Sequence, residues 1–215
     1  MTTTDALFCS LSPLRLAELV RSARHAVCYA GPGLQLDLAQ AMVEVAGRVG
    51  KEMLTVSLDF DDRVMRMGYG NVDAVKLLLD AGIAVQSSPG LRTALVVVDD
   101  AGYIFTPTAL YLEAEPTDGA ASNAVRMSGE QVAQALARLS PAAKTIAIAQ
   151  AKTPEAKQHI EALTVDVVSA PITPEKLAEV TASLETAPPV RFDLARQVRN
   201  GFAIGELAIF GSLRA

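Results

Sequence analysis

The amino-acid sequence predicts an α/β protein with a mixed, mostly parallel sheet flanked by helices, followed by an additional helical C-terminal region. Three observations support this fold class. Short apolar strands alternate with amphipathic helices through the first half, two apolar runs joined by an Asp/Gly turn predict a hairpin near the middle, and alanine-rich helices follow. Strand–helix–strand order at this spacing favours parallel pairing through right-handed crossovers.

The first half is predicted to hold alternating helices and strands that lead into the hairpin. Ser12 and Pro13 supply an N-cap and a first helical residue, and Gly50 and Gly82 end the two later helices. The predicted helices cover 12–24, 35–49 and 72–82, and the predicted strands cover 25–31, 53–58, 85–87, 94–98 and 103–106.

The second half opens with a stretch of small and polar residues that we interpret as a linker at 113–127. Ser128 and Gln131 then form a capping box, and Pro141, Pro154 and Pro174 begin further helices. The last residues form an apolar tail, which we expect to dock in the same chain or in a second subunit. The predicted domains are 11–112, an α/β domain, and 128–215, a mostly helical region with this tail.

Composition limits the classes of function. The chain of 215 residues has a formal net charge of −5, so a generally basic surface for nucleic acid is not expected. Its two cysteines, Cys9 and Cys28, are too few for a disulfide framework, and Cys28 reads as a buried, unreactive thiol. The apolar runs are too short for a membrane span, and no secretory leader pattern is present. We therefore expect a cytoplasmic protein that does not act at a membrane.

The hairpin region, QSSPGLRTALVVVDDAGYIFTPTAL at 86–110, resembles half of a phospholipase D superfamily domain. The signature of that family is H-x-K-x4-D-x6-G-S-x-x-N on such a hairpin. When the signature is anchored on Asp99, its His falls on Arg92 and its Lys on Ala94. Its Gly-Ser falls on Thr106-Pro107 and its Asn on Leu110. The resemblance covers roughly 11–112 and implies a degenerate domain that keeps the aspartate alone.

The missing residues are the ones that the family's chemistry needs. The resemblance implies that two such motifs meet, so that one histidine attacks phosphorus, the other protonates the leaving group, and the lysines neutralise the phosphoryl oxygens. Arginine can hold a phosphate but cannot act as a nucleophile or donate a proton near neutral pH. The remaining histidines, His25 and His159, lack the H-x-K context. The sequence therefore predicts a noncatalytic module without a cofactor.

Polar groups around the hairpin could still bind an anion without reacting. A guanidinium with hydroxyls suits phosphate or sulfate, and the alternative is that Arg92 pairs with a nearby carboxylate or reaches solvent. The candidate anion-binding residues are Ser88, Arg92, Thr93, Thr106 and Thr108. The expected partners are a second copy of the chain, because the family packs two halves together, and a partner protein or a phosphate-containing ligand.

Two other functions remain open. Asp59, Asp61 and Asp62 follow a predicted strand, where carboxylates could hold a divalent cation for a phosphodiesterase or nuclease, although solvated turn carboxylates are favoured. A nucleic-acid-binding regulator could use Arg191, Arg196 and Arg199, but the acidic total charge disfavours it. The glycines at 31 and 33 fit a plain strand-to-helix turn better than a nucleotide site.

Overall fold

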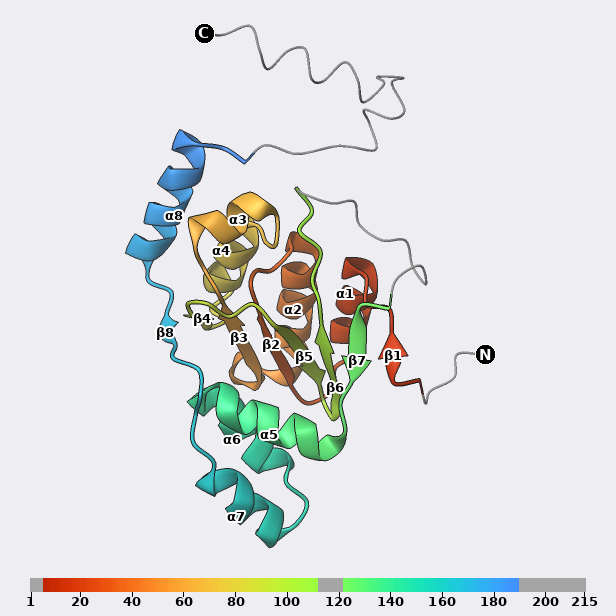
Figure 1. Ribbon diagram of the computed structural model, residues 1–215. Coiled ribbons are helices and arrows are strands. Elements are labelled where there is room, and N and C mark those ends of the chain that lie inside the picture. Colours follow the sequence, from red (N-terminus) through yellow and green to blue (C-terminus); the bar gives the residue numbers. More distant parts are fainter. Residues whose placement is uncertain (1–5, 112–121, 190–215) are drawn as a thin grey trace, which may run out of the picture.

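A single mixed sheet of eight strands organises the computed structural model, which describes residues 6–111 and 122–189 (Figure 1). The strands are β1 (Phe8–Cys9), β2 (Val27–Gly31), β3 (Leu54–Leu58), β4 (Val85–Ser87), β5 (Ala94–Val98), β6 (Ala101–Phe105), β7 (Ala124–Arg126) and β8 (Ala170–Pro171). Their order across the sheet is β1-β7-β6-β5-β2-β3-β4-β8. The predicted mixed α/β class is confirmed.

The parallel part of the sheet is smaller than the sequence predicts. β2 pairs with β3 and β3 with β4 in parallel, as the strand–helix alternation indicates, while the other five pairings among the described strands are antiparallel. The loop 88–93 between β4 and β5 is too short for a crossover helix, so β5 returns antiparallel beside β2. The short strands β1, β7 and β8 then extend both sides of the sheet antiparallel.

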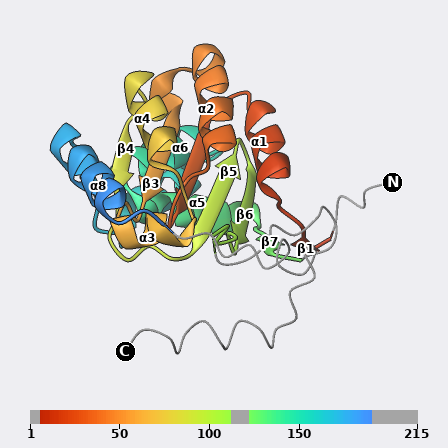
Figure 2. The ribbon, with the colours of Figure 1, turned by 90° about the horizontal axis from the view of Figure 1, so that it is seen from above.

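Helices cover both faces of the sheet. They are α1 (Pro13–Arg21), α2 (Leu36–Val49), α3 (Asp62–Met67), α4 (Val72–Asp80), α5 (Gly129–Leu139), α6 (Pro141–Gln150), α7 (Pro154–Ala162) and α8 (Pro174–Thr186), with a 3-10 turn η1 at Lys51–Met53. Figure 2 shows α1, α2 and α4 in one layer along the strands. The expected capping box at the start of α5 is present, since Ser128 and Gln131 each bond the other's backbone N–H.

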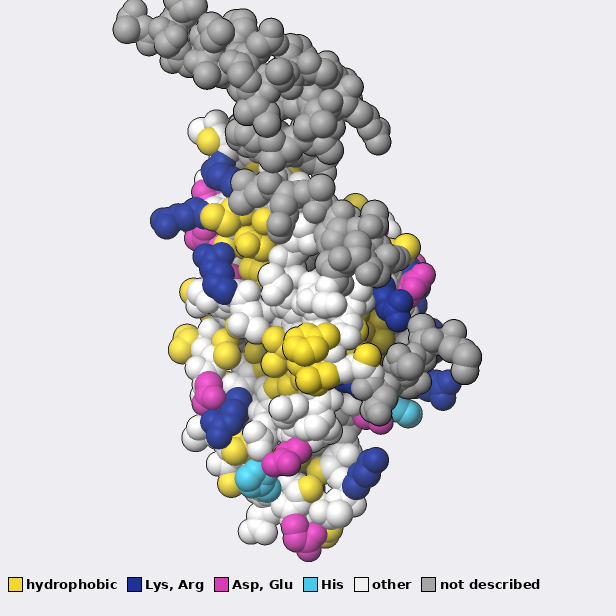
Figure 3. Space-filling model, turned by 45° about the vertical axis from the view of Figure 1, so that its right-hand side comes forward, with side chains coloured by type: hydrophobic (Ala, Val, Ile, Leu, Met, Phe, Trp, Pro, Cys, Tyr) yellow, Lys and Arg dark blue, Asp and Glu magenta, His cyan; other side chains and the backbone are white. Residues whose placement is uncertain are grey.

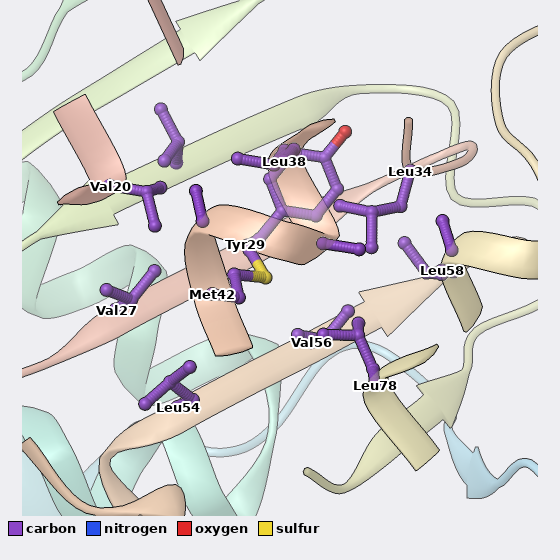
Figure 4. Close-up of a cluster of buried hydrophobic side chains, with 14 of the residues drawn as sticks. Val20, Val27, Tyr29, Leu34, Leu38, Met42, Leu54, Val56, Leu58 and Leu78 are labelled. Carbon is purple, nitrogen blue, oxygen red and sulfur yellow. The ribbon is translucent and has the colours of Figure 1, made fainter. Parts of the chain in front are cut away.

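The larger core lies between the sheet and the layer of α1, α2 and α4. Figure 4 shows Tyr29 and Met42 packed among branched aliphatic side chains of β2, β3, α2 and α4, and all of these are almost fully buried. The hydroxyl of Tyr29 donates a hydrogen bond to the carbonyl of Gly33 at 2.7 Å, so this buried phenol is satisfied. This core fixes the carboxyl ends of β2 and β3.

A second core lies on the opposite face, between the sheet and α5 to α7. It includes Cys28, Leu95 and Val97 from the strands and Leu136 and Ile146 from the helices. Burial raises the pKa of the Cys28 thiol to about 11, which agrees with an unreactive thiol. The helical segment thus packs on the same sheet as the first half.

The predicted linker and helical region contribute strands to that sheet. Residues 124–126 of the predicted linker form β7 beside β6, and β8 pairs with β4 on the other side. Residues 112–121 of the linker and the apolar tail from 190 onward lie outside the described residues. Elements from both predicted parts therefore share one sheet.

Candidate functional site

The candidate site lies at the edge of the sheet where the parallel strands end. Asp59 follows β3, Ser88 follows β4, and Arg92 precedes β5, which enters the sheet at this edge. The residue Asp59 is 5% exposed, and its Oδ2 lies 3.3 Å from Nη2 of Arg92, whose side chain is 59% exposed. Arg92 therefore has a carboxylate partner, which was one of the two alternatives for this residue.

The predicted anion-binding residues differ in burial and surroundings. Ser88 is fully buried, and its Oγ lacks a hydrogen-bond partner among the described residues. Thr93 and Thr106 are exposed at the open end of the hairpin, next to the Ala94–Phe105 pair. Thr108 instead lines a small cavity with Tyr29 and Tyr69. Ser88, Arg92, Thr93 and Thr106 thus lie at one edge of the sheet, and Thr108 lines a cavity that none of these four residues lines.

The three candidate metal-binding carboxylates have separate partners. Asp61 caps α3 by accepting a hydrogen bond from the backbone N–H of Arg63 at 2.9 Å. Asp62 accepts a hydrogen bond from Ser183 on α8 at 2.6 Å and lies 3.1 Å from Arg66. The Ser183 hydroxyl, then Arg66, hold the pKa of Asp62 below its usual value. Across residues 6–111 and 122–189, no group of three such side chains is placed to hold a metal ion.

Neither histidine lies at the edge that Arg92 occupies. The sequence has two histidines in all. His25 precedes β2, at the opposite end of a five-residue strand that spans about 16 Å. His159 lies on α7 and lines a groove beside Asp100, in the turn between β5 and β6. The edge with Arg92 therefore has no imidazole.

The aspartate that the motif retains has a structural contact. Asp99 accepts hydrogen bonds from the backbone N–H groups of Arg24, His25 and Ala26 at 2.8–3.2 Å. Partial burial by itself raises the pKa of Asp99, but these three donors together lower it below the usual value. The φ angle of Asp99 is 55°, a left-handed conformation that Asp tolerates better than most residues. Asp99 thus fixes the start of β2 to the hairpin turn.

Comparison with solved structures finds a similarity to a phospholipase D family member, Nuc from Salmonella typhimurium. The match has 14% sequence identity and a TM-score of 0.38, and it covers 55% of this chain and 77% of that one. No protein-family model and no curated protein matches the sequence. In the described part of the chain, no helix is long and apolar enough to cross a membrane. The arginines at 191, 196 and 199 lie outside the described residues.

An open groove of about 830 Å³ lies at the opposite end of the sheet, between α5, α6 and α7. Val132, Ala147 and Ile160 supply apolar lining, while Glu130 and Lys152 contribute opposite charges. Sequence reasoning did not find this groove, because its lining comes from three helices, from residues beside β1 and β7, and from the turn between β5 and β6. The mixed lining favours no single class of ligand.

An exposed apolar row crosses the outer strands of the sheet. Phe8 of β1 lies opposite Val125 of β7, which lies opposite Ile104 of β6. Side chains that lie opposite one another share a face of the sheet, so these three side chains lie side by side. The residues are 64%, 37% and 44% exposed, in the same order. Figure 3 shows hydrophobic side chains gathered on the side of the molecule that carries these strands. We call Phe8, Val125 and Ile104 the apolar row.

Proposed function

We propose that this chain is a noncatalytic phospholipase D-like module that acts by binding other proteins, including a second copy of itself. The position of Arg92 is the observation that carries the proposal. Arg92 stands where the motif places its nucleophilic histidine, and it is held against the buried carboxylate of Asp59. A guanidinium is protonated at every physiological pH, so it can neither attack phosphorus nor protonate a leaving group.

Replacement of the missing groups by neighbours has no support in the geometry. His25 lies at the other end of β2, and His159 lies on α7 and lines the groove at the opposite end of the sheet. Ala94, which stands in the lysine position, is fully buried and has no charge to neutralise a phosphoryl oxygen. The nucleophile and its electrostatic partner are therefore both missing from this edge.

Binding of protein is better supported than binding of an anion. The carboxylate of Asp59 already balances the charge of Arg92, so an anion would have to displace it or approach a neutralised pair. By contrast, Phe8, Val125 and Ile104 expose apolar surface in one continuous row. Large exposed apolar surfaces commonly mark protein–protein contacts.

Hydrolysis assays test the noncatalytic part of the proposal. We expect no turnover of bis-p-nitrophenyl phosphate, single-stranded DNA or double-stranded DNA, with or without Mg²⁺ or Mn²⁺. The wild-type chain is compared with Asp61→Ala and with Asp100→Ala, a control in an exposed turn. Metal-dependent hydrolysis that disappears in Asp61→Ala and persists in Asp100→Ala would establish the metal-dependent phosphodiesterase instead.

Light scattering after size exclusion tests self-association. We expect a mass that rises with concentration towards twice the 22.6 kDa of one chain. A mass of one chain at every concentration would contradict the proposed self-association, whatever surface is involved.

A further inference from the structure

We propose that two copies of this chain pair edge to edge through β1, antiparallel and around a two-fold axis at Phe8. This inference rests on the proposed self-association and names the surface that performs it. β1 is the last strand on its side of the described sheet, so one of its two backbone edges faces away from every other strand in the sheet. Such an edge is a ready template for another strand.

The backbone of Phe8 presents its hydrogen-bonding groups on this free edge. The backbone N–H of Arg126 donates to the carbonyl of Leu7 at 2.9 Å, so Leu7 and Arg126 form a hydrogen-bonded pair. In an antiparallel ladder, hydrogen-bonded and non-hydrogen-bonded pairs alternate. The next pair, Phe8 with Val125, is therefore of the other kind, and the N–H and C=O of Phe8 point away from β7.

These two groups have no partner within residues 6–111 and 122–189. A two-fold axis at Phe8 brings the residue opposite its own copy. Each Phe8 N–H then donates to the carbonyl of the other Phe8, and both orphan groups are satisfied on each chain. The same patch is used on both copies, as a closed dimer requires.

The side chains favour the same arrangement. Side chains opposite one another across a ladder share a face, so the apolar rows of the two copies join into one row of six residues. β1 has no charged residue and no proline, which are the usual means of protecting an edge from pairing. The preceding residue, Leu7, is also 57% exposed, and its side chain lies on the opposite face of the sheet from the apolar row, because successive side chains of a strand alternate.

The short strand limits the strength of the contact. Two paired strands of two residues each, with the joined apolar row beside them, bury less surface area than a standard protein–protein interface. We therefore expect a dissociation constant on the order of micromolar or weaker. A reversible dimer that forms across the micromolar range would fit this surface.

Three substitutions at Phe8 separate the side-chain and backbone contributions. Phe8→Ala removes the aromatic side chain alone. Phe8→Pro also removes the N–H that points outward, without removing a hydrogen bond to β7. Phe8→Lys places a charge in the centre of the interface. Leu14→Lys is the matched control, because Leu14 is also an apolar residue with a similar exposed fraction, 58%, on the surface of α1.

Sedimentation equilibrium and thermal unfolding are measured for each variant. We expect Phe8→Lys and Phe8→Pro to raise the dissociation constant by about tenfold or more, Phe8→Ala to raise it less than Phe8→Pro, and Leu14→Lys to leave it unchanged. The unfolding midpoint of diluted, monomeric protein should be similar in all four variants, because both side chains are exposed.

The possible outcomes separate this interface from the proposed function. If the wild-type chain is monomeric throughout, both the self-association and the β1 interface are wrong. A dimer that is as stable in Phe8→Lys and Phe8→Pro as in Leu14→Lys would overturn the β1 interface and leave self-association through another surface. Equal effects of Phe8→Ala and Phe8→Pro would overturn the backbone pairing.

Discussion

Removal of the Asp99 carboxylate should destabilise the fold, because this one group holds three backbone donors. Its oxygens accept hydrogen bonds from Arg24, His25 and Ala26 at the start of β2. Asp99→Gly is the most informative change, since glycine adopts the φ of 55° without strain, so the folded chain loses the carboxylate without a change of backbone conformation. Asp99→Asn retains a carbonyl oxygen and tolerance of this φ but loses the charge.

The size of the effect follows from the exposure of the three donors. The amide of Ala26 is partly buried, so the loss of its acceptor costs about 1–2 kcal/mol. The amides of Arg24 and His25 are exposed and can bind water, so we assign about 0.5 kcal/mol to each. Asp99→Gly should therefore lower the free energy of unfolding by about 2–3 kcal/mol, and Asp99→Asn by roughly half as much.

Urea unfolding followed by circular dichroism measures these differences. Asp100→Gly is the control, because Asp100 is exposed and occupies the same two-residue turn. Substitution by glycine at either position raises the conformational entropy of the unfolded chain by a similar amount. We expect the order of destabilisation to be Asp99→Gly, then Asp99→Asn, then Asp100→Gly. If Asp99→Gly is no more destabilising than Asp100→Gly, the carboxylate does not hold β2 and the reasoning is refuted.

The pH dependence of the same variants gives a second check. The pKa of Asp99 is lower in the folded chain than its ordinary value, so its stabilising effect is fully present above that ordinary value of about 3.9. The effect is lost as the pH falls through the lower, folded-state pKa. The difference in stability between wild type and Asp99→Asn should be constant near pH 7 and should shrink below about pH 4.

Three further predictions concern contacts that position the sheet edge. Ser183→Ala removes the hydrogen bond to Asp62 and should destabilise the docking of α8 by about 1 kcal/mol. Hydrogen exchange of the backbone amides in α8 should become faster, and unchanged exchange rates would contradict the contact. Because the pKa of Asp62 is lowered, this docking should weaken only as the pH falls below the usual aspartate range. Gly33→Ala would place a Cβ 2.7 Å from the Tyr69 carbonyl oxygen, whereas the Cβ of Gly47→Ala would meet open space. We therefore expect a lower melting temperature for Gly33→Ala than for Gly47→Ala. Equal melting temperatures would refute the close packing at Gly33.

The fold could be predicted from sequence where the signal is local. The hairpin of β5 and β6 was predicted because its strands flank a short Asp-rich turn. The structure shortens the predicted turn of residues 99–102 to two residues, and places Val98 opposite Ala101. The parallel core of β2, β3 and β4 followed from strand–helix alternation. The short strands β1, β7 and β8 could not be predicted, since two or three residues show no periodicity. β1 and β7 pair across 115 residues of chain.

The candidate site could be predicted only in part, because its residues come together from separate parts of the chain. Arg92 was recognised from the motif, but its partner Asp59 directly follows an earlier strand and is brought beside it by the sheet. Thr108 was proposed as one of the polar groups around the hairpin, and no local pattern shows that it lines a cavity with Tyr29 and Tyr69. Asp99 was taken for a turn residue, because no local pattern reveals its three distant donors.

The route of the chain between β7 and β8 makes the helical segment inseparable from the rest. The backbone leaves the sheet beside β6, passes through α5, α6 and α7, and returns at the far margin beside β4. A fragment truncated at residue 112 would lose β7 and β8. It would also lose the helices that cover the apolar side chains of Cys28, Leu95 and Val97. Such a fragment should be poorly soluble, so the natural unit for expression spans both halves.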